Sequence, residues 1–147
     1  MKHIWTVLCQ SSSTDTETKL LSIFNCLEAL NMEVDKTKLT PGNKIMTPIS
    51  FQMISFWSLE DFDKASRLEI RVELVSPEGE ILNKFEKEYE VKKGTKRFRN
   101  SINFNGLTVV GSGRYIMRVN QKNMSSKKFE VVSEIPLDLD ILYKSFK

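Results

Sequence analysis

The segment Gly111–Val132 reads GSGRYIMRVNQKNMSSKKFEVV, and its pattern indicates how the chain folds. Apolar side chains recur at every second position on both sides of a polar stretch, Asn120–Ser126; they are Tyr115, Met117 and Val119 before it and Phe129 and Val131 after it. A period of two is typical of a half-buried β-strand. Two such runs around a polar turn predict a closing β-hairpin.

The same period of two appears elsewhere, between stretches of turn residues. The clearest case is Arg67–Val75, where apolar and charged residues alternate and the turn Pro77-Glu78-Gly79 follows. Further strands are expected at His3–Cys9, Thr47–Leu59, Glu80–Val91 and Arg97–Phe104. This spacing predicts an all-β fold, an antiparallel β-sandwich of about eight strands, completed by a short C-terminal helix.

The segment Lys19–Leu30, KLLSIFNCLEAL, fits two structures. The first is a helix with Thr14 or Asp15 as a cap. Its apolar residues at helical spacing would be Leu20, Ile23, Phe24, Leu27 and Leu30. The alternative is a strand that places Leu21, Ile23, Asn25 and Leu27 on one face. The pattern alone fits a helix slightly better.

The final segment, Glu134–Lys147, differs from the strands because Pro136 separates it from the run before it. Its apolar residues lie four, three and four positions apart: Ile135, Leu139, Leu142 and Phe146. That spacing predicts an amphipathic helix. We therefore expect a β-sandwich domain at 1–133 and a C-terminal tail at 134–147, which docks on its own domain or, as a helix, on a protein partner or a second copy.

Composition sets limits on the class of protein. A chain of 147 residues with 40% hydrophobic and 28% charged residues fits one globular domain. The net charge of +3 does not by itself indicate nucleic acid. Cys9 and Cys26 lack metal-site spacing and are expected to be reduced thiols. The apolar run Ile4–Cys9 is too short for a signal peptide, and no run approaches the ~20 residues of a membrane span, so we expect a cytoplasmic protein without membrane contact.

Catalytic and metal-binding signatures are weak. His3 is the one histidine, which argues against a zinc site and against a serine or cysteine nucleophile that a histidine activates. The acidic loop with Glu60, Asp61 and Asp63 lacks the glycine and distal glutamate of a calcium loop. A strand follows Gly111-Ser112-Gly113, unlike a phosphate-binding loop. We expect no catalytic residue, metal or cofactor; a pair of carboxylates for hydrolysis is the weakest alternative.

Two further groups of residues suggest binding surfaces. The first is a basic run with Phe98 inside it: Lys92, Lys93, Lys96, Arg97 and Arg99. Cations with an aromatic ring suit a single-stranded nucleic acid, although Glu86, Glu88 and Glu90 are expected to neutralise them by cross-strand pairing. The second is a group of aromatic residues that are expected mainly in the core, with Trp57 and Phe62 as the exposed pair: Trp5, Phe51, Phe56, Trp57 and Phe62.

Three places carry a family resemblance: KLLSIFNCLEAL after a strand and a polar loop, TPISFQMISFW, and a PEG turn that is followed by an ending with GRYIMRV and KKFEV. Together they resemble a family of uncharacterised bacterial proteins, small β-sandwiches without an assigned activity. The resemblance covers most of Lys2–Val132 and excludes the tail. It implies that Leu21–Glu28 is a strand paired with the first strand, and it brings no catalytic residues.

The leading hypothesis for function is a non-enzymatic module that binds a protein or another ligand. The partner, or a second copy, would contact the tail or a strand edge. The alternative is nucleic-acid binding through Lys92–Arg99, and a hydrolase with a carboxylate site is weaker still.

Overall fold

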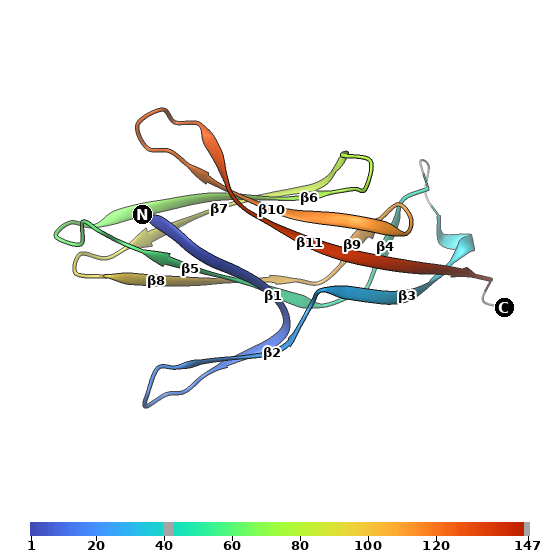
Figure 1. Cartoon of the computed structure of the whole chain (residues 1–147), viewed down its shortest axis with the longest axis horizontal. Coiled ribbons are helices and arrows are strands. Elements are labelled where there is room, and N and C mark those ends of the chain that lie inside the picture. Colours follow the sequence, from blue (N-terminus) through green and yellow to red (C-terminus); the bar gives the residue numbers. More distant parts are fainter. Residues whose placement is uncertain (40–42, 146–147) are drawn as a thin grey trace.

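A computed structural model describes residues 1–39 and 43–145, and the fold in these residues is all-β (Figure 1). The one helical element in this described part of the chain is a 3-10 turn at Lys36–Lys38. The strands are β1 Lys2–Thr14, β2 Leu21–Cys26, β3 Ala29–Asp35, β4 Ile45–Thr47, β5 Phe51–Ser58, β6 Ser66–Val75, β7 Ile81–Val91, β8 Arg97–Phe104, β9 Leu107–Val109, β10 Gly113–Lys122 and β11 Phe129–Lys144.

The strands form two larger sheets that face each other (Figure 1). Sheet A has the order β2-β1-β5-β8 and sheet B the order β3-β11-β10-β6-β7, while β4 and β9 form a small third sheet. Buried side chains from both sheets make one core, including Met53 and Trp57 of β5, Ile70 of β6 and Tyr115 of β10. Burial of this apolar surface is the main source of stability.

The predicted closing hairpin is confirmed as β10 and β11, with Tyr115 opposite Leu137 and Met117 opposite Ile135. Its turn is built by the Asn123 side chain, whose Oδ1 accepts the backbone N–H of Ser125 at 2.9 Å. Asparagine is suited to such turns because its side chain bonds to its own backbone two residues on.

The predicted C-terminal helix is wrong. Residues 129–144 form β11, which pairs antiparallel with β10 and parallel with β3. Every second residue from Leu137 to Ile141 is buried, whereas Leu142 faces away and is 54% exposed. The apolar period of two at Leu137, Leu139 and Ile141 therefore outweighs the helical spacing, and Phe146 lies outside the described residues.

The predicted number and pairing of strands are also wrong. The described residues contain eleven strands in three sheets, where about eight antiparallel strands were expected. The strands that were not expected include β4 and β9, of three residues each, and β3, whose pairing with β11 is parallel. β11 runs without interruption across residues 133 and 134, where the sequence suggested a boundary between domain and tail.

The segment Lys19–Leu30 is not a helix. β2 pairs antiparallel with β1, which confirms the pairing that the family resemblance implied for this segment. The chain then turns at Leu27, whose N–H donates to Leu8 O at 2.8 Å, and β3 begins at Ala29. Tertiary pairing with β1 therefore overrides the local helical spacing.

Candidate functional site

The outer face of sheet A carries two stacked aromatic rings. Trp5 of β1 lies opposite Phe56 of β5, and their rings stack with centroids 5.6 Å apart and planes inclined by 22°. Both side chains are partly exposed. A β-bulge between His3 and Trp5 sets this arrangement, because it lets His3 point inward onto Trp57 while Trp5 points outward.

Arginine and lysine residues border the stacked rings on the same face. Arg99 of β8 lies directly opposite Phe56, and Arg97 and Lys2 both lie opposite Ser58 of β5. Directly paired residues of neighbouring strands project to the same side of a sheet. The outer face of sheet A therefore presents three cations around a Trp–Phe stack, and we call Lys2, Trp5, Phe56, Arg97 and Arg99 the cationic face.

The turn between β7 and β8, residues 92–96, adds Lys92, Lys93 and Lys96, all of them exposed, and we call it the basic turn. Within residues 1–39 and 43–145, none of these three lysines forms an ion pair, nor does any cation of the cationic face. Arg99 makes one long contact, from Nη2 to Thr14 Oγ1 at 3.5 Å. These six positive charges are thus available to an anionic ligand.

The expected neutralisation by the acidic strand does not occur. β7 pairs with β6 in sheet B, while β8 pairs with β5 in sheet A, so the glutamates of β7 face other partners. Glu86 bonds to Arg71 at 2.9 Å and Glu88 to Arg67 at 3.0 Å. The charges that adjoin each other in the sequence are therefore separated between two sheets.

Phe62 links the basic turn to the acidic loop before β6. Its backbone O accepts the N–H of Gly94 at 2.7 Å, and the Lys96 ammonium lies 5.0 Å from the centre of its ring. The Phe62 side chain is 36% exposed. Asp61 of the same loop pairs with Lys64 at 3.4 Å, which satisfies part of the negative charge beside the turn.

Trp57, expected to be exposed, is fully buried. Its Nε1 donates to Asn100 Oδ1 at 2.7 Å, and Asn100 Nδ2 donates to the Tyr89 hydroxyl at 3.4 Å. Burial raises the pKa of Tyr89. Because neighbours in a strand point to opposite sides, burial of Trp57 turns Phe56 outward, and this alternation was the available signal for the true exposed pair.

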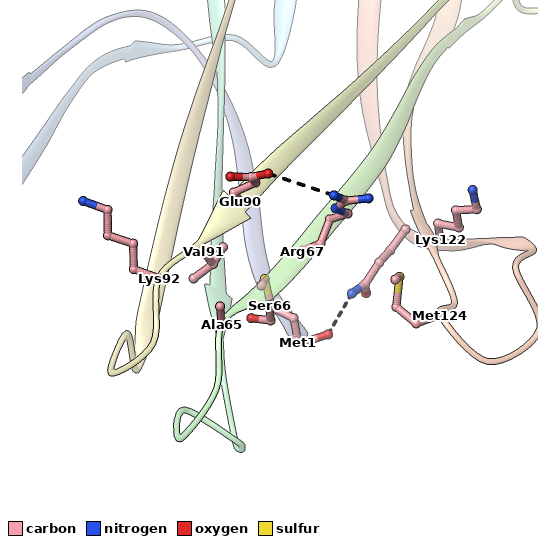
Figure 2. A pocket seen from close by; sticks show the side chains of 10 residues that line it. Met1, Ala65, Ser66, Arg67, Glu90, Val91, Lys92, Lys122 and Met124 are labelled. Carbon is pink, nitrogen blue, oxygen red and sulfur yellow. Dashed lines mark hydrogen bonds and ion pairs between the residues drawn. The ribbon is translucent and has the colours of Figure 1, made fainter.

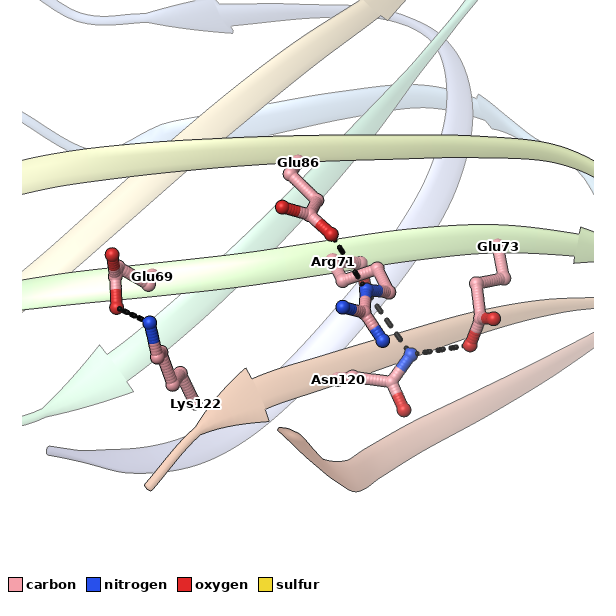
Figure 3. A network of polar contacts seen from close by, with 6 residues as sticks. All are labelled: Glu69, Arg71, Glu73, Glu86, Asn120 and Lys122. Carbon is pink, nitrogen blue, oxygen red and sulfur yellow. Dashed lines mark hydrogen bonds and ion pairs between the residues drawn. The ribbon is translucent and has the colours of Figure 1, made fainter. Parts of the chain in front are cut away.

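The outer face of sheet B has a different character (Figure 3). Lys122 bonds to Glu69 at 3.2 Å, and this bond lowers the pKa of Glu69. Asn120 Nδ2 donates to Glu73 Oε1 at 2.8 Å, and Glu86 pairs with Arg71 as described above. The cations drawn in Figure 3 are therefore already neutralised by protein carboxylates.

An open pocket of about 630 Å³ lies where β6, β7 and the end of β10 meet (Figure 2). Arg67 is held by Glu90 across a 4.0 Å ion pair, and the Gln121 side chain donates to the backbone O of Met1 at 2.8 Å. Lys92 of the basic turn lines this pocket, and Lys2 lines a neighbouring one. The pockets thus adjoin the cationic face, and their lining mixes both charges.

No protein-family model matches the sequence, and the search among curated proteins found no match either. In the described part of the chain, no group of three or more His, Cys, Asp or Glu side chains is arranged to hold a metal ion. The same residues contain no helix of the length and apolar character needed to cross a membrane.

Proposed function

We propose that the protein is a non-enzymatic binding module that holds single-stranded nucleic acid on the cationic face and the adjoining basic turn. One observation carries the proposal: in the described residues, three cations without ion pairs border the partly exposed stack of Trp5 and Phe56, and three more lie on the adjoining turn. Cations bind phosphates and release counterions, while aromatic rings stack on unpaired bases.

A single strand suits this surface better than a duplex does. Stacking on Trp5 or Phe56 requires a base whose flat face is free, and in a duplex the neighbouring pairs occupy both faces. The sheet supplies rows of side chains across β1, β5 and β8. This arrangement lets the phosphate backbone of the nucleic acid run beside Arg97 and Arg99 while one of its bases reaches the rings of Trp5 and Phe56.

Docking of the C-terminal segment as a free helix is no longer a basis for a protein-binding function. That segment belongs to β11, which pairs with β10 on one side and with β3 on the other in sheet B. Its candidate residues also do not form one surface, since Leu139 is buried and Leu142 points the other way.

The test measures the fluorescence anisotropy of a labelled single-stranded oligonucleotide at several salt concentrations. We expect the double variant Arg97→Ala/Arg99→Ala to bind at least about tenfold more weakly, because hydrogen bonds to charged groups are each worth about 1.5–3 kcal/mol. The slope of log affinity against log salt should fall by about 1.4, since each lost phosphate contact removes about 0.7.

The matched control is Lys36→Ala/Lys38→Ala, which removes two exposed lysines from the 3-10 turn after β3, away from the start of β8 (Figure 1). This variant should bind like the unchanged protein. Equal affinity for both double variants, or binding without salt dependence, would contradict the proposal. Poly-glutamate should compete poorly, because it offers charge without bases; equally strong competition would rule out the stacking contribution.

A further inference from the structure

Cys9 and Cys26 lie directly opposite each other in the hairpin of β1 and β2. The neighbouring pair, Leu8 and Leu27, is hydrogen-bonded through the Leu27 N–H at 2.8 Å. Because hydrogen-bonded and non-hydrogen-bonded pairs alternate along antiparallel strands, the two cysteines occupy a non-hydrogen-bonded position. Their Cα atoms are then about 4.5 Å apart, and disulfides span Cα separations of about 4.4–6.8 Å.

The two thiols differ in their access to solvent. Cys9 is 0% exposed, while Cys26 is exposed, and both are free thiols in the structure. A reagent in solution therefore meets Cys26 first. Cys9 is reached only from within the protein, by its cross-strand partner.

We propose that Cys9 and Cys26 form a reversible cross-strand disulfide by exchange with a low-molecular-weight disulfide such as oxidised glutathione. The Cys26 thiolate attacks one glutathione sulfur, the glutathione S–S bond breaks, and one glutathione thiolate leaves. The Cys9 thiolate then attacks Cys26 Sγ and displaces the second glutathione. Two protein thiols are oxidised, one glutathione disulfide is reduced to two thiols, and the two thiol protons pass to the departing thiolates.

The bond would fix the base of the hairpin formed by β1 and β2, which makes up the β2 edge of sheet A (Figure 1). Beyond Cys9, this hairpin is held to β5 and β8 by few side-chain bonds, among them Ser12 Oγ to Gln52 Oε1 at 2.7 Å. A disulfide closes the loop between residues 9 and 26 and so restricts the unfolded chain. We expect the oxidised protein to unfold at a higher temperature, and this inference does not rest on the proposed nucleic-acid binding.

The test exposes the folded, full-length chain to oxidised glutathione and measures its intact mass. The unchanged protein should end two hydrogen atoms lighter, with neither cysteine open to alkylation, and dithiothreitol should restore both thiols. Cys9→Ser should instead retain one glutathionyl group on Cys26, because the attacking thiol is missing. Cys26→Ser should remain unmodified, because Cys9 is buried.

A peptide map should then locate the bond between residues 9 and 26. Because Cys9 is buried and a buried cysteine packs as a small hydrophobic side chain, Cys9→Ala provides a second variant in case the serine variant does not fold. The proposal is overturned if the unchanged protein, like Cys9→Ala, keeps a glutathionyl group at Cys26, or if oxidation only links separate chains.

Discussion

His3 shows how a single residue connects the core to the candidate site. Its Nε2 lies 2.7 Å from Thr6 Oγ1, and its ring meets Trp57 edge-on with centroids 5.0 Å apart. Burial lowers the pKa of His3 below its ordinary value of 6.5, and the backbone of Trp5 opposes part of that effect. The neutral imidazole is therefore the form that the folded protein favours.

Stability should consequently depend on pH through this residue. The contribution of the neutral His3 side chain to the free energy of unfolding is fully present above pH 6.5, the ordinary pKa that applies in the unfolded chain. It is lost as the pH falls through the lower pKa of the folded state, because the unfolded chain binds the proton more strongly than the folded protein does. We expect the urea midpoint to fall between about pH 8 and about pH 5, the range in which histidine titrates. His3→Gln should reduce that change.

Since His3 is the one histidine of the chain, its ring signals in an NMR titration report directly on it. A folded-state pKa at or above 6.5, or an identical pH dependence in the His3→Gln variant, would contradict this interpretation.

At the scale of elements, β11 joins an antiparallel and a parallel pairing in one sheet. It lies between β10 and β3 in sheet B: its first part pairs with β10 as far as Leu139, and its last part pairs with β3 from Asp138 onward. Leu139 is 3% exposed, whereas Leu142, three positions later, is 54% exposed. A helix with the predicted spacing would have buried both leucines on one face.

The two leucines therefore give a matched pair of substitutions. Leu139→Ala should lower the free energy of unfolding by about 2–5 kcal/mol, because it leaves a cavity in the core. Leu142→Ala should change it by no more than about 0.5 kcal/mol, as is usual for exposed positions. Urea unfolding of both variants is the measurement, and similar losses in both would contradict the strand assignment.

The elements also show what local patterns can predict. Gly111–Val132 and Arg67–Val75 were predicted correctly, because their period of two is visible without knowledge of the partner strands. The helix at Glu134–Lys147 was wrong, because Ile135, Leu139 and Leu142 fit a helix while pairing with β3 is a long-range event.

The candidate site was predictable only in part, for the same reason. The run Lys92–Arg99 is visible in the sequence, but its lack of ion pairs depends on β7 and β8 entering different sheets. The pairing of Trp5 with Phe56 depends on a bulge and on the register of β1 with β5. The alternation along β5 does indicate that Phe56 and Trp57 point to opposite sides, but the sheet that each strand enters and the register with β1 leave no local signature.

On the scale of the whole molecule, charge is distributed unevenly between the two sheets. The outer face of sheet B carries several ion pairs, among them Arg114 to Asp138 at 2.7 Å. The hydrogen bond from Arg114 lowers the pKa of Asp138. The cations of sheet A lack such partners in the described residues. A net charge of only +3 thus conceals one strongly cationic side.

The C-terminal strand β11 also connects β3 to the rest of sheet B. A chain that ends at Glu134 loses the partner of β3 and three buried side chains, Leu137, Leu139 and Ile141. Burial of each contributes about 1.5–3 kcal/mol, so their sum is comparable with the ~5–15 kcal/mol that stabilises a typical domain. We expect this chain to lose cooperative thermal unfolding in circular dichroism, whereas a chain that ends at Lys144 keeps it, because every residue of β11 remains. Cooperative unfolding of the shorter chain at an unchanged temperature would show that residues 135–144 are an appendage to the fold, and the parallel pairing of β3 with β11 would then be wrong.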